Sequence, residues 1–577
     1  MRRKQLRLCQ LTTPFESDSA GTWEVYPRPQ LRRASYQSLC GLWRLTVIRR
    51  EGQEELGEIQ VPFPPESRIS RIFRQLAPGE WYRYERTFRL QEPVRGGHIL
   101  LHFGAVDQHA RVFLNGQAVG EHTGGYLPFT LDVTAAVTEG ENALTVEVED
   151  PLDTELPYGK QRRDRGGMWY TPISGIWQPV WLERVPASYV HSLRLTPGLD
   201  HVMVETEGGT VEKCLTLRLP EGERQYRYAG DTTVIQVEDP ILWTPENPHL
   251  YHFSLQAGED VIESYFALRT VTVESLGRRS YICLNGEPLF LHGLLDQGYY
   301  SDGIYLPASP EGYRWDILTM KRLGFNLLRK HIKIEPDLFY YYCDTYGMIV
   351  WQDMVNAGAY SFLIDTALPT LGIKRGVEHR PSPRRREYFE ASARETVECL
   401  YNHPCMCCYT IFNEGGRLYR ELKALDPSRI WDTASGWFTE EESDVTSEHV
   451  YFRSLRLKAR PDRPLVLSEF GGYSCKIPGH AFNLDKTYGY RNFRDLLSFR
   501  AGLERLYREE VMAAIAEGLC AAVLTQVSDV EDETNGLVTY DRRVVKVEED
   551  TMSALAVDLH AAFARQIPEG RRPPSGQ

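Results

Sequence analysis

Two glutamates, Glu414 and Glu469, stand at the ends of apolar runs that are typical of β-strands. The strings Ile411-Phe412-Asn413-Glu414-Gly415 and Leu467-Ser468-Glu469-Phe470-Gly471-Gly472 each place a glycine within two residues of the carboxylate. If both runs belong to one parallel barrel, the two carboxylates face each other across its mouth. Facing carboxylates are what the retaining hydrolysis of a glycosidic bond requires, because one attacks the anomeric carbon and the other protonates the leaving oxygen.

The length and charge of the chain limit its possible partners. Its 577 residues are 42% hydrophobic and carry a formal net charge of −13, which allows roughly three or four domains with separate cores. Nucleic acid is an unfavourable partner, because its binding requires a basic surface. The basic cluster Arg384-Arg385-Arg386 is predicted to be the solvated start of a helix.

The same composition predicts a cytoplasmic protein without a membrane partner. No apolar run has the length of a membrane span, and Met1-Arg2-Arg3-Lys4 is not followed by the apolar segment of a secretory signal. The eleven cysteines have no framework spacing, which indicates free thiols in a reducing compartment. Cys405, Cys407 and Cys408 lack a second Cys/His pair at zinc-site spacing, so we expect core thiols, no metal site and no cofactor.

The first part of the chain reads as β-structure. Up to about residue 185, strand patterns at 98–103, 110–114 and 143–148 accompany the hairpin turn Asn115-Gly116. Residues 162–167 are too polar and glycine-rich for a core, and they predict a long loop of the kind that often has a function. Further short strands at 190–195, 214–219, 232–237 and 251–255 predict a second β-sandwich over 186–274.

After about residue 275, strand patterns alternate with helical ones. The eight candidate strands are 289–297, 325–331, 348–354, 407–413, 430–435, 448–452, 465–470 and 519–526. One helix is expected to begin at Ser309-Pro310, and another, over 335–346, is expected to end at Gly347. Eight such units predict a (β/α)8 TIM barrel over 275–566, with Glu414 ending strand four and Glu469 ending strand seven. The tail 567–577 is expected to be disordered.

The two glutamate strings resemble those of glycoside hydrolase family 2, the β-galactosidase and β-glucuronidase family. The resemblance extends over nearly the whole chain and implies a jelly-roll sugar-binding domain (1–185), an immunoglobulin-like β-sandwich (186–274) and a catalytic barrel. The further motifs that carry it are Gly41-Leu42-Trp43-Arg44, Gly125-Tyr126-Leu127-Pro128-Phe129, Gly175-Ile176-Trp177-Gln178-Pro179-Val180, residues 324–329 and 342–353, and residues 526–542.

The resemblance implies that Glu414 is the acid/base and Glu469 the nucleophile. Glu414 must then be protonated near neutral pH, and burial or the negative charge of Glu469 would raise its pKa accordingly. Once Glu469 is consumed in a glycosyl-enzyme, Glu414 can act as a base. Asn413 would hydrogen-bond the 2-hydroxyl of the sugar; the alternative for this side chain is to cap the helix that follows.

Strand two departs from the family pattern. Many members have Arg-x-x-His-Tyr-Pro there, whereas this chain has Arg329 followed by His331 one position early and by Ile332. Since side chains alternate along a strand, His331 and Lys333 would share one face unless the strand has already ended. Lys333 could bind an acidic sugar or pair with Asp353 or Glu335. Arg329 and Asp296, at the ends of strands two and one, are further candidate substrate-binding residues.

Strand eight departs as well. The Asn-x-Lys pair that binds the sugar carboxylate in β-glucuronidases of the family is missing, because the nearest string is Asn535-Gly536-Leu537. A uronidase would have to use Lys333, Arg542 or another cation. Thr525-Gln526 stands where several members have a tryptophan. The stacking surface for the sugar could instead be Trp169, Tyr170, Trp351, Trp437 or Tyr473.

The sequence therefore predicts a retaining, exo-acting β-glycoside hydrolase that releases a terminal sugar from a carbohydrate or glycoconjugate. The sugar could be β-galactose or a β-hexuronic acid, which would make the protein a β-galacturonidase or β-glucuronidase without the usual Asn-x-Lys pair. A transglycosylase uses the same residues, and a non-catalytic carbohydrate-binding barrel is the alternative from another class. The resemblance also allows a homo-oligomer.

Overall fold

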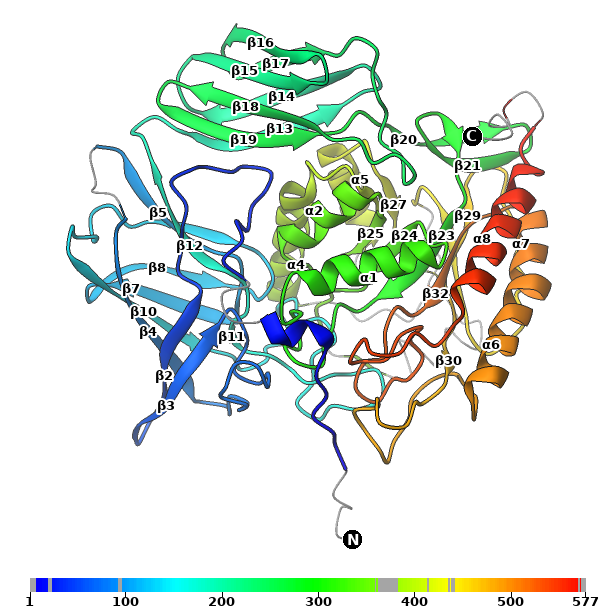
Figure 1. The fold of residues 1–577 in the computed structure, drawn as a ribbon, viewed down its shortest axis with the longest axis horizontal. Coiled ribbons are helices and arrows are strands. Elements are labelled where there is room, and N and C mark those ends of the chain that lie inside the picture. Colours follow the sequence, from blue (N-terminus) through cyan, green and yellow to red (C-terminus); the bar gives the residue numbers. More distant parts are fainter. Residues whose placement is uncertain are drawn as a thin grey trace.

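The computed structural model describes residues 7–18, 23–91, 96–358, 360–361, 382–411, 415–433, 436, 442–568 and 571. Glu414, Asn413 and Trp437 lie outside these residues. The described chain forms two β-sandwiches and a barrel whose helices cover its outer face (Figure 1).

Two antiparallel sheets pack on one core in the first part of the chain. Their strand orders are β3-β2-β4-β10-β7-β8 and β1-β12-β5-β9. Buried residues alternate with exposed ones along β10, as in a sheet with one face in a core. The turn between β7 and β8 has positive φ at Asn115 (53°) and Gly116 (80°), which confirms the predicted hairpin. The bounds are β1 (Gln37–Ser38), β2 (Gly41–Arg49), β3 (Gly52–Val61), β4 (Trp81–Arg89), β5 (His98–Phe103), β7 (His109–Leu114), β8 (Gln117–Thr123), β9 (Phe129–Asp132), β10 (Glu141–Glu149) and β12 (Val180–Val185).

A second, smaller sandwich follows, and Figure 1 shows it above the barrel. Its sheets have the orders β13-β14-β17 and β16-β15-β18-β19, and they share a separate core. All four predicted strands are present. The bounds are β13 (Val190–Pro197), β14 (His201–Gly208), β15 (Glu212–Leu219), β16 (Gly222–Ala229), β17 (Thr232–Gln236), β18 (Tyr251–Ala257) and β19 (Asp260–Phe266).

The eight predicted barrel strands are confirmed. They form one parallel sheet of order β27-β26-β25-β24-β23-β32-β29-β28, a nearly closed TIM barrel. Every residue of β25, β29 and β32 is buried, because strands of a parallel barrel are covered on both faces. The bounds are β23 (Leu291–Asp296), β24 (Leu327–Lys330), β25 (Ile349–Asp353), β26 (Met406–Thr410), β27 (Ile430–Asp432), β28 (Thr446–Val450), β29 (Leu465–Gly471) and β32 (Leu519–Thr525). The domain boundaries stay predictions.

Helices cover the barrel on the two sides that Figure 1 shows. Helix α1 begins one residue after the predicted Ser309-Pro310 start, and α2 ends at Gly347, whose φ of 72° is favourable for glycine. The helices are α1 (Glu311–Arg322), α2 (Asp337–Tyr346), α4 (Pro383–Leu400), α5 (Gly415–Leu425), α6 (Leu496–Arg505), α7 (Met512–Ala516) and α8 (Glu549–Ala564), with a π-helix η3 (Leu506–Val511) and a 3-10 helix η1 (Pro14–Asp18). The remaining strands are β6 (Val106–Asp107), β11 (Gly175–Ile176), β20 (Val271–Leu276), β21 (Arg279–Leu284), β22 (Glu287–Pro288), β30 (Tyr473–Ser474) and β31 (Arg491–Asn492).

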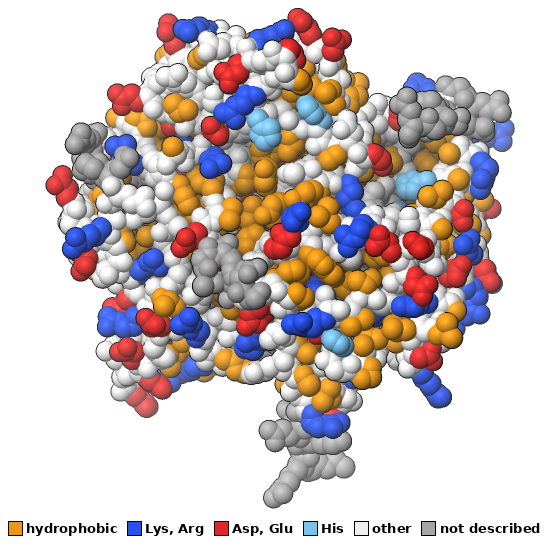
Figure 2. Space-filling model, in the orientation of Figure 1, with side chains coloured by type: hydrophobic (Ala, Val, Ile, Leu, Met, Phe, Trp, Pro, Cys, Tyr) orange, Lys and Arg blue, Asp and Glu red, His pale blue; other side chains and the backbone are white. Residues whose placement is uncertain are grey.

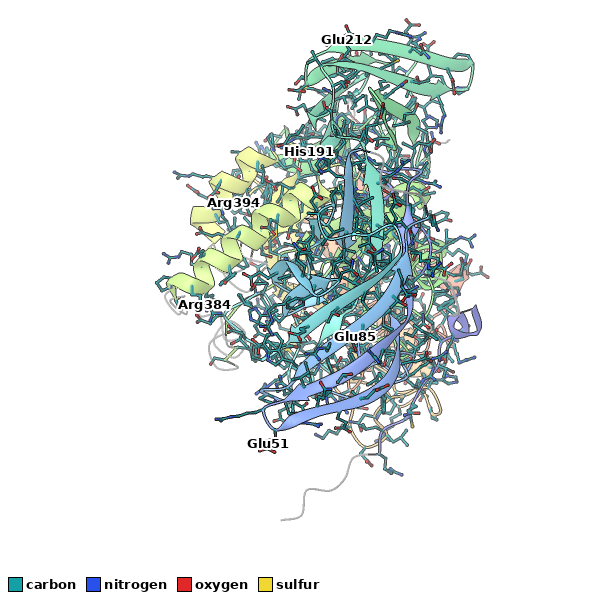
Figure 3. All side chains as sticks on the ribbon, turned by 90° about the vertical axis from the view of Figure 1, so that its left-hand side faces the viewer. Glu51, Glu85, His191, Glu212, Arg384 and Arg394 are labelled. Atoms are coloured by element: carbon teal, nitrogen blue, oxygen red, sulfur yellow. The ribbon has the colours of Figure 1, made fainter. Side chains whose placement is uncertain are left out.

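The predicted basic helix start is only partly solvated. Arg384 is exposed and forms an ion pair with Asp153 at 2.8 Å, and Figure 3 shows it at the outer end of α4. Arg385, in contrast, is buried on the inner face of α4. On the molecular face in Figure 2, Lys and Arg side chains are interspersed with Asp and Glu rather than gathered into one patch.

Three neighbouring cysteines lie in the core of the barrel. Cys405, Cys407 and Cys408 are buried in and next to β26, and all are free thiols. Burial raises the pKa of the Cys407 thiol to about 11. Within the described ranges, none of the helices combines the length and hydropathy that crossing a bilayer would need.

Candidate active site

Glu469 lies near the carboxyl end of β29 and is buried, with 6% of its surface exposed. Its Oε2 accepts a hydrogen bond from the Tyr451 hydroxyl at 2.5 Å. Its Oε1 lies 3.6 Å from Arg329 Nη1, 3.7 Å from His449 Nε2 and 3.9 Å from His331 Nδ1. This oxygen accepts no hydrogen bond from the described part of the chain. A buried carboxylate oxygen left in this state marks a functional site.

The surroundings of Glu469 keep it ionised. Burial alone would raise its pKa, but electrostatic interactions with His449, His331 and Arg329 and the hydrogen bond from Tyr451 outweigh burial, so the pKa falls below its ordinary value. Burial also lowers the pKa values of both histidines, which are therefore neutral near pH 7. Arg329 is the permanent cation among these neighbours. A carboxylate held in its charged form is suited to act as a nucleophile.

Asp353, at the end of β25, positions two of these neighbours. Its Oδ1 accepts a hydrogen bond from Arg329 Nε at 2.9 Å, and its Oδ2 lies 2.7 Å from His331 Nδ1. The carboxylate thus holds the proton of His331 on Nδ1 and leaves Nε2 as the acceptor nitrogen. Arg329 also donates to the carbonyl of Ser468, next to Glu469 in the chain. The structure therefore brings the predicted residues Arg329, His331 and Glu469 together.

Strand two ends earlier than the sequence pattern predicts. β24 stops at Lys330, and Ile332 has a φ of 42°, so the alternation of side chains does not continue to Lys333. Lys333 Nζ donates to Glu335 at 2.8 Å, to the Gly298 carbonyl and to the Tyr305 carbonyl. All its donors are used inside the protein, and the side chain is 2% exposed. These contacts agree with the alternative in which Lys333 pairs with Glu335, and sugar binding by Lys333 stays a prediction.

Two further charged candidates are also structural. Asp296 accepts hydrogen bonds from Lys330 Nζ on one oxygen and from the Gly298 backbone on the other, so it anchors Lys330 rather than facing a ligand. Arg542 is fully buried, donates to Asp316 at 3.1 Å and to the Tyr299 carbonyl at 2.8 Å. Substrate binding by Asp296 or Arg542 stays a prediction, and the contacts described give both residues a structural role as well.

The aromatic candidates differ in position. Trp351 is 1% exposed, donates from Nε1 to Thr410 and lies beneath the Arg329 guanidinium, so it is core rather than a stacking surface. Tyr473 packs against Phe493 and Arg491, and no contact among the described residues joins it to Glu469.

Trp169 lies in the loop of the first β domain. Its ring stacks on Tyr158, with centroids 6.2 Å apart and planes at 7°. It remains a proposal as a sugar-binding side chain.

The predicted loop 162–167 is a loop in the structure, and its neighbourhood packs against the segment after β32. Tyr170 Oη donates to Glu533 Oε2 at 2.8 Å, and Gln526 Nε2 donates to the same oxygen at 2.7 Å. Arg165 pairs with Glu531 at 3.0 Å. The first β domain thus contributes to the wall of the barrel mouth.

The sequence interpretation missed Tyr451, His449 and Thr525, whose hydroxyl lies 2.8 Å from that of Tyr451. Each lies at or next to the end of a predicted barrel strand, so the rule that located the two glutamates could also have found them. Within the part of the chain that is described, no group of three or more His, Cys, Asp or Glu side chains is arranged to hold a metal ion.

Comparison with known proteins gives two family matches. A glycosyl hydrolase 2 galactose-binding domain-like model matches residues 66–174, and a glycosyl hydrolases family 2 model matches residues 199–269. A β-galactosidase of Thermoanaerobacter pseudethanolicus is 26% identical over 373 residues, which are 59% of this chain and 45% of that relative. The chain also spans only 35% of the length of each of two matching proteins of Formosa agariphila.

Solved structures share the fold over most of the chain. A β-D-glucuronidase from Dictyoglomus thermophilum aligns with a TM-score of 0.72 at 18% identity and covers 94% of this chain and 99% of its own. A GH2 β-galacturonidase from Eisenbergiella tayi aligns with a TM-score of 0.67 at 20% identity and covers 92% of this chain and 98% of its own. At these identities the likeness concerns the fold alone. The family models and the relatives together show that parts of the chain are similar to proteins of glycoside hydrolase family 2.

Proposed function

We propose that the chain is a retaining β-glycoside hydrolase that removes one terminal sugar from a carbohydrate or glycoconjugate. The observation that carries the proposal is the environment of Glu469: a carboxylate near a strand end in a TIM barrel, kept ionised and with one oxygen accepting no hydrogen bond from the described residues. The relatives named β-galactosidase and β-glucuronidase support the same reaction class.

In this proposal Glu469 attacks the anomeric carbon and Glu414 protonates the leaving oxygen. The glycosidic bond breaks as the bond to Glu469 Oε forms, and water then releases the sugar with Glu414 as the base. Glu414 follows Thr410 of β26 by four positions in the sequence, and β26 pairs with β25, whose last residue is Asp353. Its role rests on the family resemblance, and so does that of Asn413 at the 2-hydroxyl.

The test replaces each glutamate in turn. Glu469→Gln is expected to abolish turnover of aryl β-glycosides, because the amide cannot form the glycosyl-enzyme. Glu414→Ala is expected to leave slow activity on activated aryl glycosides, which azide rescues by attacking the glycosyl-enzyme in place of activated water. Glu517→Gln makes the same chemical change at an exposed position and serves as the matched control.

Full activity in either active-site variant would refute the assignment. The competing function, a barrel that binds carbohydrate without catalysis, predicts sugar binding by the unsubstituted protein with no turnover of any aryl β-glycoside. Neutral and uronic aryl β-glycosides are assayed side by side.

A further inference from the structure

Lys160 belongs to the first β domain but lies at the mouth of the barrel. The preceding Gly159 has a φ of 69°, and a Cβ there would lie 2.4 Å from Tyr126 Oη and 3.2 Å from the backbone oxygen of Ile332. The chain at Gly159 is therefore in close contact with the segment that follows β24. Tyr158, one residue earlier, donates from its hydroxyl to the Gly358 carbonyl. These contacts fix the backbone of Lys160 beside the ends of strands two and three.

The ammonium group of Lys160 has no hydrogen bond or ion pair among the described residues, and its Nζ lies 5.7 Å from the centre of the Trp169 ring. The side chain is half-buried. The carboxylates that act on it electrostatically are those of Glu533, Glu469 and Asp353. Burial lowers the pKa of Lys160, which is the effect expected for a cation that has lost water without gaining a contact partner.

Four other cations near this mouth, among the residues that the structure describes, are already engaged. Arg329 holds Asp353, Lys330 and Lys333 both hold Glu335, and Arg542 holds Asp316. Their donors face carboxylates and carbonyls of the protein, whereas the three N–H groups of Lys160 have no such acceptors among the described residues. A partly desolvated ammonium in this state gains most from an anionic ligand oxygen.

We propose that Lys160 binds the carboxylate of a terminal β-hexuronic acid and so makes the first β domain the part of the chain that selects the sugar. This inference rests on the proposed glycosidase function and deepens it. Glu533 acts electrostatically on Lys160, and burial raises the pKa of its carboxyl group. Glu533 is already held by Tyr170 and Gln526, so it does not neutralise Lys160 by direct contact.

The experiment compares Lys160→Met with Lys160→Arg. The measured quantity is the ratio of kcat/KM for 4-nitrophenyl β-D-galacturonide or β-D-glucuronide to kcat/KM for the matching galactoside or glucoside. Lys160→Met is expected to lower this ratio about 30- to 1000-fold, the loss expected when a charged hydrogen-bonded partner is removed, and Lys160→Arg is expected to restore part of it. Arg162→Met removes an exposed cation two residues away in the same loop and is expected to change the ratio less than about twofold.

A second measurement separates this inference from the proposed function. Calorimetric titration of Glu469→Gln protein, with and without Lys160→Met, measures the binding of free galacturonate, glucuronate, galactose and glucose. Binding of a uronate that disappears with Lys160→Met supports the inference even if no glycoside is hydrolysed. The inference would be overturned if Lys160→Met left both the kcat/KM ratio and the uronate affinity unchanged. It would also be overturned if the unsubstituted protein hydrolysed neutral glycosides only, in which case Lys160 would donate to a sugar hydroxyl. In that last case the glycosidase assignment stands.

Discussion

Tyr451→Phe isolates the contribution of one hydrogen bond to the charge of the nucleophile. The hydroxyl of Tyr451 donates to Glu469 Oε2 at 2.5 Å, and its ring stacks on Tyr490 with centroids 3.8 Å apart. Phenylalanine keeps the ring and the stacking, so the substitution removes the donor with little change of volume. The hydroxyl of Thr525, 2.8 Å from that of Tyr451, loses a partner but remains in place.

The magnitude follows from the strength of a hydrogen bond to a charged group. Such a bond contributes about 1.5–3 kcal/mol, and 1.36 kcal/mol corresponds to one pKa unit, so losing it raises the pKa of Glu469 by about one to two units. In the proposed mechanism Glu469 reacts as the carboxylate, and activity is therefore expected to be lost as the pH falls through its pKa. Raising that pKa moves the acid limb of the pH profile to higher pH by the same amount.

The assay measures kcat/KM for an activated aryl β-glycoside across the acid range. Tyr490→Phe serves as the control, because it removes a hydroxyl from the stacked neighbour and leaves the bond to Glu469 intact. An acid limb that stays where it is in Tyr451→Phe would show that the hydroxyl does not stabilise the charged form of Glu469. Thermal unfolding of both variants checks that the fold is unchanged.

Two further substitutions test the positions of neighbouring groups. Lys333→Met leaves the buried Glu335 with one cation fewer, so it is expected to lower the free energy of unfolding, measured with denaturant, by about 3–5 kcal/mol. A selective loss of uronide turnover with an unchanged free energy of unfolding would instead indicate that Lys333 is a sugar ligand. Gly159→Ala places a Cβ 2.4 Å from Tyr126 Oη at a positive φ, so it is expected to displace the segment that carries Lys160 and to raise KM more than it lowers kcat. Equal kinetics in Gly159→Ala would show that the barrel mouth does not depend on this contact.

The barrel strands could be predicted because their burial on both faces is visible in the residue types of each short segment. Strands covered on both faces read as continuous apolar runs, and β29 and β32 consist of buried residues throughout. Glu469 could be located for the same reason, since it interrupts such a run near its end. Its ionised state could not be read in this way, because Arg329, His449 and Tyr451 reach it from two other strand ends.

Strand two shows where the sequence rule fails. The alternation of side chains requires an extended backbone, and the positive φ of Ile332 ends that geometry one residue before Lys333. The partners that use up the lysine's hydrogens, Gly298 and Tyr305, come from the loop after strand one. Such partners depend on how separate segments meet in space. The same holds for Lys160, which lies just before the predicted loop 162–167 and which the sequence interpretation did not single out.

The contact between Tyr170 and Glu533 joins residues 363 positions apart in the chain. During synthesis, the ribosome therefore releases the loop of the first domain long before the segment that completes the barrel mouth exists. A nascent chain can fold its β domains early, but it cannot present the finished mouth until β32 and the residues after it have emerged. The appearance of activity on a growing polypeptide should consequently mark the docking of its first domain onto its last strand.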